Sequence, residues 1–139
     1  MIGLVTGALY IQSCSVTCDA GYEGKGCATP FNAKFAGKYS VSDTVTSGSN
    51  VQVLNYNMNI AAPVNNPANI VIYNLHNLGA DSAVTATVTG TSIFPTLGRI
   101  DTLFISGLMG NISDSTISIY YTLSDSNFVT ENCHAIGKK

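Results

Sequence analysis

The sequence predicts an all-β fold, an antiparallel meander of about eight short strands that closes into a small barrel, with a two-sheet sandwich as the alternative. After residue 31, apolar and polar residues alternate with a period of two, as they do in strands that have one buried face. Charged residues make up only 10% of the 139 residues, Ser, Thr, Asn and Gly are abundant, and helical periodicity is absent from the body of the sequence. Closure would remove the edges that an open sheet exposes.

The alternation is strictest in residues 82–89 and 116–123, where Thr, Ser or Tyr separates the apolar residues. Each segment predicts a strand with one face in the core and one face in water. The residues expected to face the core are Val84, Ala86, Val88, Ile117, Ile119, Tyr121 and Leu123.

Residues 51–60 also predict a strand, but the apolar positions change parity at Leu54 and Asn55. A β-bulge there would return both halves of the strand to one inward face. The remaining predicted strands cover 37–45, 69–75, 91–95, 101–107 and 127–136, and segments rich in turn-forming residues separate them at 63–69, 77–81, 113–115 and 123–127.

The charge balance excludes some partners. The formal net charge is −2, and Arg99 is the single arginine, so the chain has no basic stripe to neutralise phosphates. We therefore expect no nucleic-acid partner. The interior of an eight-stranded barrel holds packed side chains or one small ligand.

Residues 2–11 are uncharged and mostly apolar, which matches the length of the hydrophobic region of a signal peptide and about half of a membrane-spanning helix. The following "IQSC" resembles the lipobox of bacterial lipoproteins, and this resemblance implies that Cys14 is acylated and begins the mature protein. Gln12 departs from the usual small residue, and no Lys or Arg precedes the apolar run, which suggests that the true start lies upstream of Met1. The alternative is a retained, apolar first strand.

The segment "CDAGYEGKGC" resembles the end of an EGF-like module, whose last two cysteines close a small loop. The resemblance implies a disulfide between Cys18 and Cys27 and thus an oxidising compartment. The earlier cysteines of such a module are missing, so the segment is a remnant. A zinc site would need a fourth ligand and a Cys-x-x-Cys knuckle, and the segment has neither. Cys133 is left as a buried thiol or as a partner of Cys14.

The order of phrases along the chain is similar to that of small secreted bacterial lipoproteins in which an EGF-like remnant precedes a compact β domain. The phrases are "FAGKYSVSD", "IVIYNLHNLG", "TATVTGTSIFP", "LFISGLMGNIS" and "TISIYYTLSDSNFVTENCHA". "GKY" at 37–39 resembles the Gly-x-Trp of lipocalin-like barrels, with Tyr39 in place of tryptophan. The resemblance implies a signal segment at 1–13, a lipidated linker at 14–30, a β domain at 31–139, and placement at the outer membrane or cell surface.

The sequence offers no catalytic or metal-binding motif. His76 and His134 have no recognisable partner and are expected to be structural, and Cys133 and His134 would point to opposite faces of a strand. No nucleophile-elbow, zincin or phosphate-binding motif occurs. We therefore expect no enzyme activity, cofactor or metal.

Five of the six aspartates precede Ser or Thr. Four of these sites resemble the O-glycosylation sites of exported proteins in bacteria that make such lipoproteins, and ordinary turn chemistry is the alternative. The implied acceptors are Thr44, Ser82, Thr102 and Ser115.

Three functions follow as hypotheses. The first is a lipid-anchored envelope protein that acts as a binding or structural module, with the membrane and a surface protein or glycan as partners. The second is a subunit of a surface filament that donates residues 2–11 as a strand to its neighbour. The third is a carrier or enzyme that uses the barrel interior.

Overall fold

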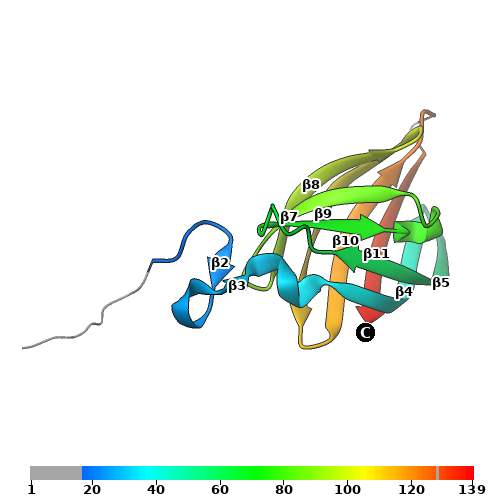
Figure 1. Cartoon of the computed structure of the whole chain (residues 1–139). Helices are drawn as coiled ribbons and strands as arrows, with labels where there is room; N and C mark the ends of the chain where they lie inside the picture. The colour runs from blue at the N-terminus through cyan, green and yellow to red at the C-terminus, as the bar shows by residue number, and fades with distance from the viewer. Residues whose placement is uncertain (1–16, 128) are drawn as a thin grey trace, which may run out of the picture.

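The computed structural model describes residues 17–127 and 129–139, and in them the predicted barrel is confirmed (Figure 1). Eight antiparallel strands close in the order β10-β11-β4-β5-β6-β7-β8-β9. These barrel strands are β4 (Gly37–Ser47), β5 (Asn50–Ala61), β6 (Asn69–Tyr73), β7 (Ala83–Thr89), β8 (Ser92–Ile100), β9 (Leu103–Ser113), β10 (Thr116–Ser124) and β11 (Thr130–Lys138).

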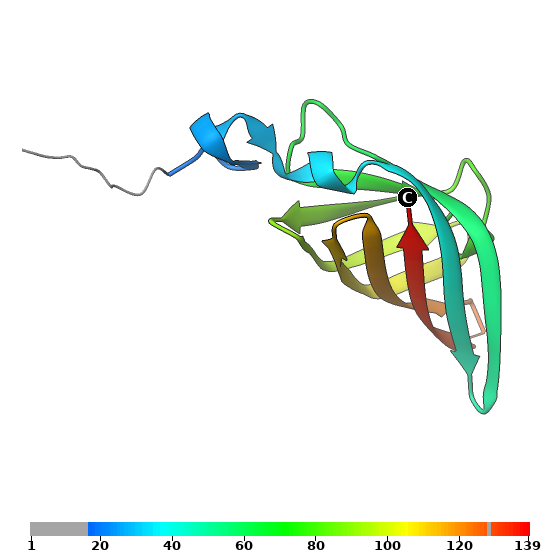
Figure 2. The same cartoon turned by 90° about the horizontal axis from the view of Figure 1, so that it is seen from below.

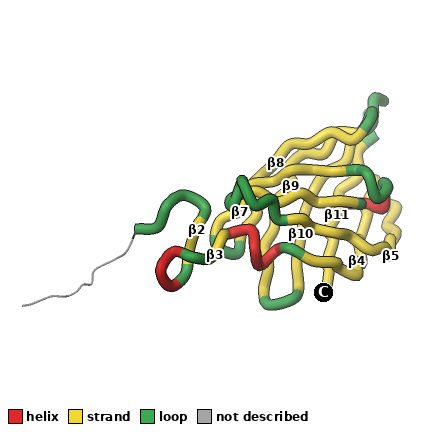
Figure 3. Tube along the Cα trace, in the orientation of Figure 1, coloured by secondary structure: helices red, strands yellow, loops and turns green. Residues whose placement is uncertain are grey.

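Helical structure in the described residues is limited to short 3₁₀ segments, drawn red in Figure 3. They are η2 (Lys25–Cys27), η3 (Phe31–Phe35) and η4 (Leu75–Asn77). A small two-stranded sheet, β2 (Tyr22–Glu23) with β3 (Thr29–Pro30), precedes the barrel and lies outside it. η3 links this sheet to β4, with Phe35 fully buried.

The core consists of inward side chains from every barrel strand, and it bears out the predicted alternation. All seven residues predicted to face inward on β7 and β10 are buried, whereas Thr85, Thr87 and Tyr120 between them are exposed. Large side chains fill the barrel, among them Tyr39, Met58, Ile60, Ile70, Ile72, Leu108, Ile117 and Ile119. The interior is therefore packed in the manner of a small barrel without a central channel.

The predicted bulge in β5 is wrong. β4 and β5 pair without interruption from Gly37↔Ile60 to Ser47↔Asn50, so the parity does not change. Val51 and Val53 point outward instead and are 64% and 53% exposed. The inward positions of β5 are the even-numbered ones, so the uninterrupted register leaves both valines on the outer face, in the part of the hairpin that extends past the neighbouring strands (Figure 2).

Two strands run further than predicted because bulges carry the chain past residues that usually end strands. β8 continues through Pro95 with shifts in its register to β9 on both sides of Thr96. β9 continues through Gly107, whose φ of 60° supplies the left-handed residue of a bulge opposite Tyr121.

Candidate functional site

An acidic side chain lies inside the barrel on β4. The inward residues of this strand are Tyr39, Val41, Asp43 and Val45, and Asp43 is fully buried. A buried carboxylate is costly unless hydrogen bonds compensate for the lost water. The surroundings of Asp43 therefore form the strongest candidate for a functional site.

Two tyrosines from other strands supply donors to Asp43. The hydroxyl of Tyr56 on β5 donates to Asp43 Oδ2 over 2.7 Å, and the hydroxyl of Tyr121 on β10 donates to the same oxygen. The second carboxylate oxygen, Oδ1, is buried and has no hydrogen-bond partner among the described residues. Both donors are thus concentrated on one oxygen.

His76 reaches this cluster from η4, which follows β6. Asn74, His76 and Asn77 all have positive φ, between 58° and 65°, a conformation that costs non-glycine residues free energy. The Asn74 side chain compensates by accepting from the Gly79 N–H at 2.8 Å and donating to the Asn57 carbonyl at 2.7 Å. The Asn74 side chain thus fixes the loop that places His76 over the barrel mouth.

The imidazole of His76 connects the buried cluster to a more exposed acid. Its Nδ1 lies 2.9 Å from the Tyr121 hydroxyl oxygen and 3.9 Å from Asp43 Oδ2, and its Nε2 lies 3.3 Å from Glu131 Oε1 on β11. The Tyr121 hydroxyl gives its one proton to Asp43, so Nδ1–H is the donor toward Tyr121. The backbone N–H of His76 also donates to Tyr56 Oη at 2.9 Å.

Cys133 on β11 borders the same cluster. Its Sγ lies 3.8 Å from His76 Nδ1 and 3.9 Å from the carbonyl oxygen of Glu131. Burial raises the pKa of the Cys133 thiol to about 12, and the negative charges of Asp43 and Glu131 act in the same direction. The thiolate that a cysteine nucleophile requires is therefore disfavoured at neutral pH, even though a histidine is close.

The two phenols are also held in their neutral form. Burial is the largest cause that raises the pKa of Tyr56 and of Tyr121, and the nearby Asp43 carboxylate raises both further. Neutral phenols are the form in which each hydroxyl can donate to Asp43. Burial and hydrogen bonding therefore support the same protonation state.

The network is closed toward the core and meets solvent at Glu131. Hollows of about 190 Å³ and 280 Å³ at the barrel mouth are both lined by Glu131, and neither is lined by Asp43, His76 or Cys133. The arrangement can hold or pass a proton between Glu131 and Asp43, but a substrate in either hollow would not be in contact with the thiol. Its evident role is to join η4 to β4, β5, β10 and β11.

No set of three His, Cys, Asp or Glu side chains among the described residues is placed to bind a metal ion. In the same part of the chain, no helix has the length and apolar character needed to cross a membrane.

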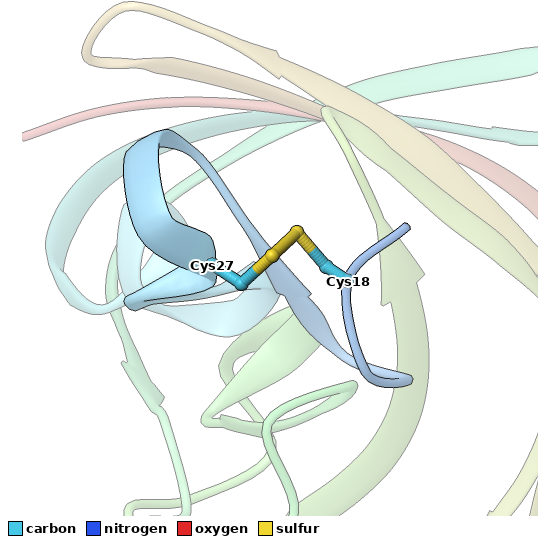
Figure 4. The surroundings of a disulfide bond; sticks show 2 residues. All are labelled: Cys18 and Cys27. Carbon is cyan, nitrogen blue, oxygen red and sulfur yellow. A yellow bond between two sulfur atoms is a disulfide. The ribbon is translucent and has the colours of Figure 1, made fainter. Parts of the chain in front are cut away.

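The predicted disulfide between Cys18 and Cys27 is confirmed (Figure 4). Their Cα atoms are 5.3 Å apart, and the bond joins the chain before β2 to the end of η2. Cys133 is a free, buried thiol, which was the first of the two alternatives predicted for it. Cys14 and residues 2–11 lie outside the described residues.

The disulfide-bonded segment 17–30 is attached to the barrel by specific contacts. Gly21 has φ 90°, and a Cβ atom built on it would lie 2.7 Å from Pro67 Cγ in the β5–β6 loop. Lys34 bonds Glu23 Oε1 and the Gly90 carbonyl, both at 2.6 Å. The segment is therefore packed against the end of the barrel where β4 begins.

Asn32 in η3 anchors the same junction. It is 2% exposed, and its Nδ2 lies within 3.1 Å of the carbonyl oxygens of Pro63, Asn66 and Asn69. One amide group thus organises the long connection between β5 and β6.

The four predicted glycosylation sites occupy different environments. Asp101-Thr102 and Asp114-Ser115 form two-residue hairpin turns in which the aspartate has positive φ, a position that aspartate favours. Thr102 and Ser115 are exposed. Ser82 is half-buried, and its hydroxyl donates to the Gly79 carbonyl at 2.6 Å. Thr44 is exposed on the outer face of β4, directly after buried Asp43.

Both histidines, for which the sequence showed no recognisable partner, have partners in the structure. His134 points outward and stacks on Tyr120, with ring centroids 3.9 Å apart, and its Nε2 lies 2.8 Å from Ser118 Oγ. Cys133 points inward, so the predicted opposition of Cys133 and His134 is confirmed. The partners of both histidines come from other strands, which a search for local motifs does not detect.

Asp43 is the site residue that sequence reasoning missed, although a signal for it exists. Tyr39, Val41 and Val45 have the same parity in "GKYSVSDTV", which places the acid between them on the buried face. An acidic residue at an inward position of a strand indicates a compensated, specific environment.

Comparison of the chain with protein-family models and with curated protein sequences finds no match.

Proposed function

We propose that the protein is exported, is anchored by lipid at Cys14 to the outer membrane or cell surface, and acts there as a binding or structural module. The observation that carries this proposal is the Cys18–Cys27 disulfide in a segment packed on the barrel. Disulfides persist in oxidising compartments. Cys14 lies four residues before the disulfide, where a lipid would hold the barrel end with η3 near the membrane.

The packed interior supports a role that uses the outside of the barrel. Tyr39, Met58 and Ile119 fill the space that a carrier of this size would leave for its ligand. A groove of about 520 Å³ runs over the outer face near the end of β6 and is lined by Lys38, Asn57, Asn59, Tyr73 and other residues. Its amide, amine and hydroxyl groups suit a polar partner such as a surface glycan or a protein loop.

The buried network supports the same role. The thiol pKa and the enclosure of Asp43 disfavour a nucleophilic mechanism, whereas the hydrogen bonds rigidify the mouth of the barrel. A scaffold whose mouth is held by a side-chain hydrogen-bond network suits a module that presents a fixed surface. We extend the proposal to O-glycosylation at the exposed Thr44, Thr102 and Ser115, with Ser82 the least accessible acceptor.

The decisive experiment is intact mass spectrometry of the protein purified from its natural host. The proposal requires a mature chain that begins at Cys14, carries acyl chains and is two hydrogen atoms lighter than the reduced form. A matched Cys14→Ser variant should leave the membrane fraction or stay unprocessed, and a Cys133→Ser variant should fractionate like wild type. An unmodified N-terminus with residues 2–11 retained would refute the anchor.

A further inference from the structure

The barrel is closed, but one long stretch of β5 has no neighbour on one side. β5 pairs with β4 along its whole length and with β6 only through Asn59, Ile60 and Ala61. In the described part of the chain, residues 50–56 have no strand on the side away from β4. Figure 2 shows the β4–β5 hairpin extending past its neighbours. We call residues 50–56 the open edge.

The hairpin geometry identifies which backbone groups face this edge. Gly48 and Ser49 form a two-residue turn, with Gly48 at φ 60°, between the paired residues Ser47 and Asn50. Residues that flank such a turn exchange hydrogen bonds, and the pattern then alternates along the ladder. The even-numbered residues of β5 therefore bond to β4, and the N–H and C=O groups of Val51, Val53 and Asn55 face the open edge.

An independent contact agrees with this assignment. The carbonyl of Asn57, the next odd residue, accepts from Asn74 Nδ2 at 2.7 Å on the side away from β4. The hydrogen bonds from Asn74 and His76 to β5 go to Asn57 and Tyr56, and Val51, Val53 and Asn55 are exposed.

The open edge lacks the features that usually prevent strands from pairing between molecules. Such edges normally carry a charge, a proline or a bulge. β5 contains none of these, its register with β4 is continuous, and its tip exposes Val51 and Val53. An uncharged, regular and partly apolar edge is suited to accept another strand.

We propose that the open edge pairs with the open edge of a second copy of this chain, antiparallel, about a two-fold axis at Val53. Val53 then lies opposite its equivalent, and Val51 lies opposite Asn55 of the second copy. Each facing pair exchanges two backbone hydrogen bonds, because all three residues direct their N–H and C=O groups to this side. The register is symmetric, as a two-fold interface requires.

A second copy is favoured because the patch is self-complementary. No charge opposes itself across the axis, and outward side chains would continue across it from one molecule to the next. On each molecule, a row of outward-facing residues that pair with one another across neighbouring strands runs from β9 to Val53. The row consists of Met109, Tyr120, His134 and Thr44. Pairing at Val53 would join the two rows into one surface.

Cross-linking of variants that carry one added cysteine tests the register. In a full-length Cys14→Ser background, Val53→Cys should form a disulfide-linked dimer under mild oxidation, because hydrogen-bonded antiparallel pairs have Cα atoms about 5.5 Å apart. Val64→Cys is the matched control, since Val64 is 90% exposed in the β5–β6 loop. Val64→Cys should link slowly. Asn55→Cys should link slowly as well, because its equivalent would lie more than about 13 Å away along the strands.

Sedimentation of the full chain over a range of concentrations supplies a second, independent readout. Val53→Lys should weaken dimerisation at least tenfold, about 1.4 kcal/mol, since like charges would face each other at the axis. Val64→Lys should leave it unchanged. A monomer at all concentrations, or equal linking rates for the residue-53 and residue-64 cysteine variants, would overturn the proposal.

A photoreactive group on the residue-53 cysteine distinguishes the competing occupant. Adducts to residues 50–56 of a second copy are expected. Adducts to residues 2–11 would instead show that a donated N-terminal strand fills the edge, as in the filament hypothesis, and would refute pairing between copies of β5.

Discussion

The side chains of Asp43 and Tyr121 are 78 residues apart in the chain, and they meet inside the barrel, where the Tyr121 hydroxyl donates to Asp43 Oδ2. The contact joins β4 to β10 across β11, which lies between them in the barrel. It also closes the network that holds η4 at the mouth. The contribution of this contact to the free energy of unfolding can be measured directly.

Replacement of Tyr121 with phenylalanine should destabilise the protein. The change removes one of the two tyrosine donors to a buried carboxylate and the hydroxyl partner of His76, so a loss of about 1–3 kcal/mol is expected in urea-induced unfolding. Tyr120→Phe is the matched control, because that neighbouring ring points outward and is 50% exposed. Equal losses for the two variants would show that the Asp43 contact adds no stability.

Alkaline pH should destabilise the fold. Burial raises the pKa of Tyr39 from 10.0 to about 12. The folded state therefore binds this proton more tightly than the unfolded state, so the stabilisation is complete below pH 10 and is lost as the pH rises toward 12. Unfolding free energies measured across this window should fall. Each buried tyrosine whose pKa is raised contributes up to about 1.4 kcal/mol per pH unit.

Tyr39→Phe separates the contribution of this phenol from the others. The variant loses the hydrogen bond from Tyr39 to the Phe35 carbonyl, at 2.7 Å, and so starts less stable. Its stability should nevertheless decline less steeply with pH, because one proton fewer is linked to folding. A slope identical to that of wild type would contradict the assignment.

The Cys133 thiol should be inert in the folded protein. It is 5% exposed and its pKa is raised to about 12, so at neutral pH the reactive thiolate is scarce and shielded. In a Cys14→Ser variant kept oxidised, iodoacetamide should label residue 133 rapidly after denaturant is added and very slowly before. Fast labelling of the native protein would indicate an opening of the barrel mouth.

Substitution of Gly21 tests how firmly the disulfide-bonded segment is attached. Gly21→Ala places a methyl group 2.7 Å from Pro67 Cγ at a φ of 90°. Gly26→Ala is the control, because Gly26 also has a positive φ, 71°, but has no atom within 4 Å of the added carbon. Both variants should incur about 1–2 kcal/mol of backbone strain, and Gly21→Ala an additional 1–3 kcal/mol, roughly, from the clash.

Limited proteolysis distinguishes the two glycine variants directly. Gly21→Ala should expose the segment 17–36 to cleavage while the barrel stays intact, and Gly26→Ala should resist like wild type. Similar protection in both would mean that the Pro67 contact does not hold the segment in place.

The barrel was largely predictable because each strand has one buried face, which period-two alternation records. The valines at the tip of β5 misled this reasoning. They alternate like buried residues, but they occupy outward positions of an uninterrupted ladder, and hydrophobicity alone does not report which face of the strand is buried. The bulges near Pro95 and Gly107 were also unpredictable. Proline and glycine usually end strands, but they are tolerated where the register shifts, and the sequence does not show where a shift occurs.

Predicting the polar cluster from the sequence would require two kinds of information. Asp43 is at an inward position of β4, and parity could have identified it. The partners Tyr121, His76 and Glu131 could not have been assigned, because strand order around the barrel and the left-handed turn of η4 decide which inward residues meet. Local patterns give the face of a residue, and only the closed topology gives its neighbours.

Proline substitutions on adjacent residues of β5 should have opposite outcomes and thereby test the open edge itself. The N–H of Gln52 bonds to β4 at Val45, so Gln52→Pro removes a ladder hydrogen bond, leaves its acceptor unpaired and should cost about 1–3 kcal/mol. The N–H of Val53 faces the open edge, where proline is tolerated, so Val53→Pro should cost less than about 1 kcal/mol. Unfolding is measured at low concentration, so that any self-association does not contribute. Equal destabilisation by both prolines would show that residue 53 donates within its own barrel, and that the edge is not open.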